Sequence, residues 1–356
     1  MKITFRWYGE GDKISLSDIR QIPTVDGVVT AVYDTPVGGV WSGESIKKLA
    51  VAARKNGVPW EVVESVPVHE DIKLGLPSAR TYIDNYKENL RRLSAVGIKC
   101  VCYNFMPVFD WLRSELAFPL EDGSNALAYK HESVVGMNPL TSELSLPGWD
   151  ASYKKDGLKT LLTRYRAVTD EVLWDNLKAF LSEVIPVAGE CGIKMAIHPD
   201  DPPWGIFGLP RIITNIGNIE RFLRLVDDPY NGITLCTGSL GAAKENNLTD
   251  IIKTAKGRIP FVHMRNVKIT GGRDFCETAH PSACGDIDMY AVLKALLDGG
   301  FDGYVRPDHG RMIWGESGRP GYGLYDRALG AAYIGGLYEA LTKSDSRDKR
   351  MKMRLP

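Results

Sequence analysis

The sequence predicts a single α/β domain built as a (β/α)8 TIM barrel, with one long insertion after the fourth strand. Eight short runs of β-branched or aromatic residues alternate with amphipathic helical patterns along the 356 residues. Successive runs begin about 25–45 residues apart, the usual length of a βα unit, except for one long gap. Parallel strands need crossover connections, and the helical patterns between the runs supply them.

Each predicted strand is a short apolar run bordered by Gly, Pro or Asp. In chain order the runs are Ile3–Tyr8, Gly27–Tyr33, Trp60–Glu64, Ile98–Asn104, Ile193–His198, Ile233–Cys236, Pro260–Met264 and Gly303–Pro307. A doubly wound sheet is the structural alternative. The sequence contains neither G-x-G-x-x-G nor G-x-x-x-x-G-K-[ST], the motifs of nucleotide sites on such sheets. The strand count therefore favours the barrel.

Helical patterns separate these strands. The clearest is Arg80–Val96, whose apolar residues recur along one face and whose end is marked by Gly97. The others are Ser45–Lys55, Thr169–Glu190, Ile219–Val226, Thr249–Lys256, Ile287–Leu297 and Tyr325–Leu341.

We expect one domain over residues 1–343, with residues 105–168 as the insertion. This segment is rich in Pro, Trp, Ser and Gly and shows little periodicity. Loops this long are usually functional, and an insertion after a barrel strand lies on the catalytic face. A solvent-exposed decoration or an oligomer contact is the alternative. Residues 344–356 read as a frayed basic tail.

Composition excludes several classes of protein. The chain is 44% hydrophobic and 25% charged, which is typical of a globular protein. Its 44 basic residues balance 44 acidic ones, so we expect no nucleic-acid or membrane partner. No apolar run reaches the roughly 18–20 residues of a membrane span, and the N-terminus lacks a signal-peptide core. Six widely spaced cysteines fit reduced thiols, which predicts a cytoplasmic protein.

Metal-ligand residue types stand at the ends of the last four predicted strands: His198, Cys236, His263 and Asp308. In a barrel these ends meet around one point, where catalytic residues gather. Two imidazoles, a thiolate and a carboxylate suit Zn²⁺, Fe²⁺, Co²⁺ or Mn²⁺. The alternative is a structural zinc site with no open coordination position. The ligands of such sites usually come as pairs close in sequence, such as C-x₂₋₄-C. Ligands on separate strands instead indicate a working site with room for substrate.

Further polar residues are expected on the same face. His309 follows the last proposed ligand and is placed to be a general acid or base, and Tyr322 in a glycine-flanked turn could donate a phenolic proton. Arg265, Asn266 and Asn104 are predicted to bind substrate, since Arg pairs with a carboxylate through both oxygens.

Two other groups of residues receive no catalytic role. Cys100 and Cys102 alternate along one strand and so share a face, which predicts core packing. The stretch Phe275–Asp288, with Glu277 and His280, follows the seventh strand and could form a lid edge or support the site.

Long motifs around these residues resemble mannonate dehydratase nearly end to end. They are FRWYG, HPDDPPWGIFGLPRI, LCTGS, FVHMRNVK, FCETAHPSACGDIDM and VRPDHGR. The resemblance implies a xylose-isomerase-like barrel that converts D-mannonate to 2-dehydro-3-deoxy-D-gluconate and water in glucuronate catabolism, using Mn²⁺ or Fe²⁺. It assigns the metal ligands to His198, Cys236, His263 and Asp308, and the acid and base to His309 and Tyr322. We also expect a homodimer.

The predicted metal ligands and acid–base residues fit the dehydration of a sugar acid. One group must take the C2 proton and another must protonate the C3 hydroxyl as it leaves, while a divalent ion stabilises charge on the substrate oxygens. The sequence does not say which of His309 and Tyr322 is the base. Two alternatives stay open: a metal-dependent sugar isomerase or epimerase on the same barrel, and a non-catalytic binding protein stapled by zinc.

Overall fold

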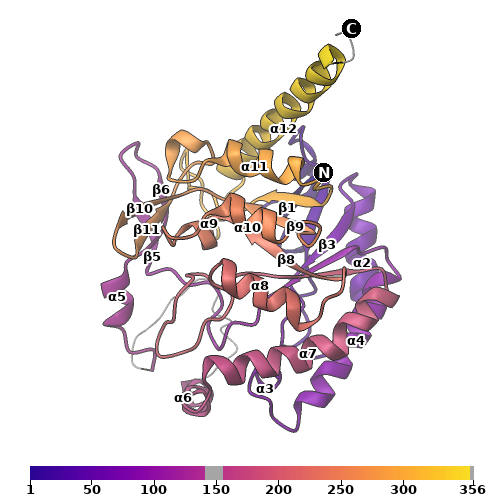
Figure 1. Cartoon of the computed structure of the whole chain (residues 1–356), viewed down its shortest axis with the longest axis vertical. Helices are drawn as coiled ribbons and strands as arrows, with labels where there is room; N and C mark the ends of the chain where they lie inside the picture. The colour runs from indigo at the N-terminus through magenta and orange to yellow at the C-terminus, as the bar shows by residue number, and fades with distance from the viewer. Residues whose placement is uncertain (141–154, 353–356) are drawn as a thin grey trace.

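Eight parallel strands close into a barrel at the centre of the protein (Figure 1), in a computed structural model that describes residues 1–140 and 155–352. They are β1 (Lys2–Arg6), β2 (Gly27–Thr30), β3 (Trp60–Glu64), β4 (Cys100–Tyr103), β7 (Lys194–Ile197), β8 (Asn231–Cys236), β9 (Phe261–Met264) and β12 (Tyr304–Pro307). The ring closes where β1 pairs in parallel with β12. The predicted strands and the predicted barrel are confirmed.

The barrel strands are buried on both faces, which explains their nearly continuous apolar sequences. Every residue of β4, β8 and β9 is buried. A separate apolar cluster of Val29, Val62, Cys100, Cys102, Ala196 and Phe261 draws on five of the barrel strands. Cys100 and Cys102 pack together there, as predicted.

The helices that surround the barrel follow the predicted ones within a few residues. They are α2 (Gly43–Lys55), α4 (Ala79–Ser94), α7 (Asp170–Glu190), α8 (Ile216–Leu225), α10 (Leu248–Thr254) and α11 (Met289–Asp298). Short elements without a clear apolar period were not predicted: α1 (Leu16–Arg20), α3 (Glu70–Lys73), α9 (Thr237–Gly241) and the 3₁₀ turn Ser282–Cys284. Aromatic side chains join neighbouring helices, as where the rings of Tyr86 on α4 and Phe180 on α7 meet edge to face at 5.1 Å.

The last helix is longer than the sequence indicated. We expected it to end at Leu341 and a frayed tail to begin at residue 344, but α12 runs over Tyr325–Lys352 and its far end projects from the body (Figure 1). The apolar pattern ends near Leu341, so it could not show the continuing helix. Residues 353–356 lie outside the described residues. Within the described ranges, no helix is both long and apolar enough to cross a membrane.

The insertion has its own structure, although its sequence shows little periodicity. Its described elements are β5 (Glu115–Pro119), β6 (Asn125–Tyr129), α5 (His131–Val135) and α6 (Lys155–Tyr165). A hairpin after β9, made of β10 (Val267–Gly271) and β11 (Asp274–Glu277), completes an antiparallel sheet in the order β10-β11-β6-β5 (Figure 1, left). The Tyr129 and Phe275 rings stack across this sheet at 5.5 Å. The insertion is thus joined to the loop that follows the seventh barrel strand.

Candidate active site

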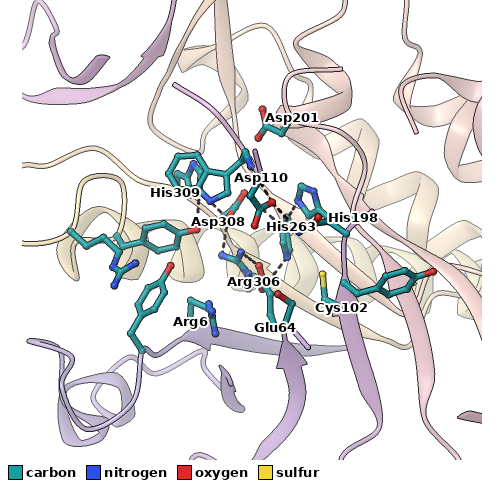
Figure 2. Close-up of a pocket in the computed structure, with 17 residues that line it drawn as sticks. Arg6, Glu64, Cys102, Asp110, His198, Asp201, His263, Arg306, Asp308 and His309 are labelled. Atoms are coloured by element: carbon teal, nitrogen blue, oxygen red, sulfur yellow. Dashed lines mark hydrogen bonds and ion pairs between the residues drawn. The ribbon is translucent and has the colours of Figure 1, made fainter. Parts of the chain in front are cut away.

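A pocket of about 190 Å³ lies at the carboxyl ends of the barrel strands (Figure 2). Six of the nine predicted site residues line it: Asn104, His198, His263, Asp308, His309 and Tyr322. The insertion adds Asp110 and Trp111 to the wall, so it borders this pocket as an insertion on the catalytic face would. The other three predicted residues, Cys236, Arg265 and Asn266, are fully buried behind the lining.

The four proposed metal ligands converge at one side of the pocket. The ligand atoms of His198, Cys236 and His263 all lie within 4.8 Å of one another, and His198 Nε2 is 3.2 Å from His263 Nδ1. Asp308 Oδ2 lies 3.7 Å from His263 Nδ1 and 3.8 Å from Cys236 Sγ. Four side chains from four strand ends therefore point their donor atoms at one small volume.

These donors fit a divalent transition metal. Ligand atoms bound about 2.0–2.3 Å from one ion lie about 3–4 Å from each other, which is the spacing seen among these side chains. Two imidazole nitrogens, a thiolate and a carboxylate form a mixed set typical of first-row transition metals rather than of Ca²⁺ or Mg²⁺. His198, Cys236, His263 and Asp308 can therefore hold such an ion.

Arg306 fixes the Asp308 carboxylate. Arg306 Nη1 lies 2.7 Å from Asp308 Oδ1, which leaves Oδ2 directed toward the proposed ion. Burial alone would raise the pKa of Asp308, but Arg306 and neighbouring cations hold it well below its ordinary value. Asp308 is thus held ionised, as a metal ligand must be.

Glu64 supports the same cluster from below in the view of Figure 2. It binds Arg306 through two hydrogen bonds of 3.0 and 2.9 Å, and its Oε2 lies 3.3 Å from His263 Nε2. A metal-bound imidazole usually gives its second ring nitrogen to a carboxylate, which fixes its tautomer and orientation. Glu64, Cys102 and His263 also form a second ligand group. Because Glu64 already binds Arg306, we interpret it as the partner of His263.

His309 and Tyr322 form a hydrogen-bonded pair beside the cluster. His309 Nε2 lies 2.9 Å from the Tyr322 hydroxyl and 3.7 Å from Asp308 Oδ1. Burial raises the pKa of Tyr322 well above its ordinary value, with Tyr8 and Asp308 adding to the effect. The phenol therefore stays protonated near neutral pH and is available as a proton donor.

A fully buried set of alternating charges stands behind His309. Glu277 Oε1 is 2.8 Å from His309 Nδ1 and receives hydrogen bonds from both Arg113 and Arg265. The same two arginines bind Asp201 at 2.8–3.0 Å. Burial would raise the pKa of Glu277, but His309, Arg265 and Arg113 hold it below its ordinary value. The insertion thus supports His309 through Arg113.

The predicted substrate contacts divide into two kinds. Asn104 lines the pocket, where its Nδ2 donates to Asp110 Oδ1 at 2.9 Å. Arg265 lies behind the lining, where it binds Asp201 and Glu277, and its Nη1 lies 2.9 Å from His309 Nδ1. Its Nη2 and Nε each lie 3.5 Å from a proposed ligand atom, Cys236 Sγ and Asp308 Oδ2. The Asn266 side chain donates to the backbone of Pro281 and accepts from that of Ile287, which holds a loop in place.

Sequence reasoning missed the supporting roles of Arg113, Asp201 and Glu277. Glu277 lies in the loop after the seventh strand, where the sequence predicts no definite role, and Asp201 stands in the motif around His198. Arg113 lies in the aperiodic insertion, where no pattern links it to a strand end.

A profile of the family D-mannonate dehydratase (UxuA) matches residues 1–348. The chain belongs to the mannonate dehydratase family. It is 57% identical over 344 residues to mannonate dehydratase 2 of Halalkalibacterium halodurans, covering 96% of this chain and 100% of that protein. It is 54% identical to the mannonate dehydratase of Streptococcus uberis, covering 97% and 99%. The crystal structure of mannonate dehydratase from Streptococcus suis serotype 2 superposes with a TM-score of 0.91 at 49% identity, covering 97% and 96%.

More distant structures share only the barrel. A D-tagatose 3-epimerase-like protein gives a TM-score of 0.56 at 15% identity, and a xylose isomerase domain protein from Planctomyces limnophilus gives 0.54 at 13%. These likenesses confirm the predicted xylose-isomerase-like fold. The predicted resemblance to mannonate dehydratase is also confirmed, and the isomerase or epimerase alternative is not favoured. As a mannonate dehydratase the protein is a hydro-lyase, a metal-dependent enzyme acting on a small sugar acid.

Proposed function

We propose that the protein dehydrates D-mannonate to 2-dehydro-3-deoxy-D-gluconate and water in glucuronate catabolism, with Mn²⁺, or Fe²⁺ as the alternative, held by His198, Cys236, His263 and Asp308. The supporting observation is that His198, His263 and Asp308 line one pocket together with the His309–Tyr322 pair, and that the Cys236 thiol lies directly behind the wall beside these donors. When bound, the ion would supply Lewis-acid stabilisation of negative charge on the substrate oxygens.

His309 acts as the base in this proposal. Its Nδ1 lies 2.8 Å from Glu277 Oε1 and 2.9 Å from Arg265 Nη1. In this proposal Nδ1 carries the proton, which Glu277 accepts, and Nε2 keeps its lone pair. Nε2 faces the pocket beside Tyr322 and can take the C2 proton of the substrate. Glu277 then stabilises the imidazolium that forms.

Tyr322 acts as the acid. Its buried phenol has a pKa raised well above its ordinary value, so it holds a proton until the leaving group needs one. As the C3–O bond breaks, the electron pair of the C2–H bond forms the C2–C3 double bond, and Tyr322 gives its proton to the departing hydroxide. The resulting enol becomes the 2-keto acid. Because His309 Nε2 is 2.9 Å from the phenol oxygen, the proton taken from C2 can return to Tyr322.

For substrate binding, the proposal keeps Asn104, which lines the pocket. Arg265 and Asn266 receive supporting roles instead. Arg265 is bound to Glu277 and Asp201 and also contacts His309 and Cys236, and Asn266 binds the loop backbone.

The test is turnover of D-mannonate by chelated protein that is re-supplied separately with Mn²⁺, Fe²⁺ or Zn²⁺. We expect the 2-keto-3-deoxy acid, detected colorimetrically, only after a metal is added, and more with Mn²⁺ or Fe²⁺ than with Zn²⁺. No product from folded, metal-loaded protein would contradict the proposal. A C2-epimerised or isomerised sugar instead of a keto-deoxy acid would revive the isomerase alternative.

The proposal includes a cytoplasmic homodimer. All six cysteines are free, and Cys236 must stay reduced to bind metal, which suits a reducing compartment.

For the dimer, the exposed rings of Trp314 and Tyr325 lie 5.7 Å apart and form an apolar surface that a second copy could cover. Light scattering on the wild type and on Trp314→Glu tests this contact, and a wild-type monomer would contradict it.

A further inference from the structure

Two arginines line the pocket beside Tyr8: Arg6, which is buried at the end of β1, and Arg319, which is exposed in the loop that carries Tyr322. The guanidinium carbons of Arg6 and Arg319 lie 4.5 and 4.0 Å from the centre of the Tyr8 ring. Both arginines and Tyr8 line the same pocket as His309 and Tyr322. A cation over an aromatic face is oriented by the ring but keeps its N–H groups for another partner.

These arginines are paired less closely than Arg306, although Arg6 interacts with the charge of Glu64 and its Nη1 donates to the Val29 carbonyl at 3.4 Å. Arg306 is engaged by Glu64 and Asp308 through short ion pairs. Among the residues that the structure describes, neither Arg6 nor Arg319 forms an ion pair with a carboxylate. A guanidinium fork that faces a ligand pocket without a protein counter-ion is suited to an anionic substrate.

We propose that Arg319, with Arg6 and Tyr8, binds the carboxylate of the sugar acid. This inference rests on the proposed function, because it assigns one end of the substrate of that reaction. The planar fork of Arg319 would bind both carboxylate oxygens, and Arg6 would contribute a second positive charge.

Because Arg319 lies close to Tyr322, a carboxylate bound to Arg319 would place the reacting carbons near the acid–base pair. Arg319 and Tyr322 belong to one short loop, and the Tyr8 ring meets the Tyr322 ring edge to face at 5.1 Å. The carboxylate carbon of the substrate is one bond from C2 and two from C3. A carboxylate held beside Tyr322 therefore presents C2 and C3 to the acid–base pair, with the rest of the sugar chain free to extend through the pocket.

Arg319 also lies between the pocket and a second cavity, whose lining carries Lys13 and the carboxylates of Asp12, Asp18 and Glu316. The Arg319 side chain is exposed, and together with Tyr8 and Tyr322 it borders both this cavity and the pocket. An exposed cation at a pocket mouth attracts anionic ligands over a distance that salt shortens. Capture of the substrate should accordingly weaken as ionic strength rises.

The test compares Arg319→Gln and Arg319→Lys with the wild type, and uses Arg273→Gln as the matched control. The Arg273 guanidinium also lies over an aromatic ring, that of Trp204 at 5.5 Å, but it does not line the active-site pocket. Steady-state kinetics with D-mannonate are measured on metal-loaded protein at low and high salt. Unfolding temperature and metal content are measured on each sample.

We expect Arg319→Gln to raise KM about 10- to 100-fold and to change kcat less than about threefold, since the lost contact is present before and during the reaction. The salt dependence of kcat/KM should fall in this variant. Arg319→Lys should recover part of the affinity and the salt dependence, and Arg273→Gln should match the wild type.

Three results would overturn the inference: an unchanged KM in Arg319→Gln, a fall in kcat alone, or an equal rise in KM in Arg273→Gln. If the wild type itself does not turn over D-mannonate, the proposed function fails. Calorimetric binding of D-mannonate to the loaded wild type and to Arg319→Gln then decides the inference. Equal affinities would reject the carboxylate site, and weaker binding by the variant would retain it.

Discussion

The two ends of the active-site pocket are built in different ways. At the inner end, Asp308 and His263 are buried side chains on or beside barrel strands. Arg306 forms an ion pair of 2.7 Å with Asp308, and Glu64 Oε2 lies 3.3 Å from His263 Nε2. At the outer end, Arg319 is an exposed loop residue whose guanidinium carbon lies 4.0 Å from the centre of the Tyr8 ring. Groups that must keep a fixed geometry during the reaction are each held by several neighbouring side chains. A group that must meet the substrate keeps its hydrogen-bonding capacity free.

The two ends of the pocket should also differ in how much their side chains contribute to the stability of the protein. Removing one partner of a buried ion pair leaves an uncompensated charge and costs about 3–5 kcal/mol, whereas an exposed side chain contributes about 1 kcal/mol or less to stability. Substitutions at the inner end should therefore change metal content, rate and stability together. Those at the outer end should change substrate affinity alone.

The largest expected effect is that of Asp308→Ala. The substitution removes a donor and leaves Arg306 without one of its partners, so we expect metal content far below one ion per chain and no measurable turnover. Metal analysis of the purified variant checks this. A full metal complement would count against Asp308 as a ligand.

The next largest effect is that of His309→Asn. Loss of the general base should lower kcat about 10²- to 10⁴-fold while one ion per chain stays bound, because His309 is not among the proposed donors. Metal content and turnover are measured on the same sample. Substantial turnover with stoichiometric metal would reject His309 as the base.

Glu277→Gln should have a smaller effect on the rate. The amide no longer stabilises a charged imidazole, and we expect kcat to fall about 10- to 100-fold with metal retained and KM nearly unchanged. Asp286→Asn is the control, since Asp286 lies in the same loop but bonds the backbone of Ile269. Equal kinetics in the two variants would show that Glu277 does not act through His309.

Arg113→Met should act mainly on stability. It leaves Asp201 and Glu277 with one buried cation fewer, and we expect unfolding to become easier by about 3–5 kcal/mol. Denaturant unfolding measures this change. A variant as stable as the wild type would show that Arg265 alone can balance both carboxylates.

The pH dependence of stability extends this prediction. Burial would raise the pKa of Asp201 and of Glu277, but Arg113 and Arg265, with His309 at Glu277, hold both below their ordinary values. Carboxylates with a depressed pKa in the fold stabilise it above about pH 4 and lose that contribution as pH falls. Without Arg113 both pKa values rise, so the variant should begin to unfold at a higher pH than the wild type. Coincident acid transitions would contradict this.

The sequence was most informative where the backbone has a fixed period. The sequence predicts that His198, Cys236, His263 and Asp308 lie together because each stands at the end of a recognisable strand, and barrel closure brings strand ends together whatever the intervening loops do. The surrounding helices were predicted equally well, because their apolar residues recur along one face.

The parts of the site that the sequence did not predict depend on contacts between segments far apart in the chain, and a single sequence does not reveal such contacts. Arg113 meets Glu277 only because the insertion forms a sheet with the hairpin after β9, and neither segment carries a clear period. Arg265 and Asn266 were assigned to substrate from their place after His263. The direction of a side chain beyond a strand end is set by its partners, which here are Glu277 and the backbone of Pro281.

The most direct test of the proposed metal centre is anomalous diffraction from a crystal of the Mn²⁺-loaded protein. The account predicts one peak within about 2.0–2.3 Å of His198 Nε2, Cys236 Sγ, His263 Nδ1 and Asp308 Oδ2. A peak among Glu64, Cys102 and His263 Nε2, or no peak in the pocket, would contradict it.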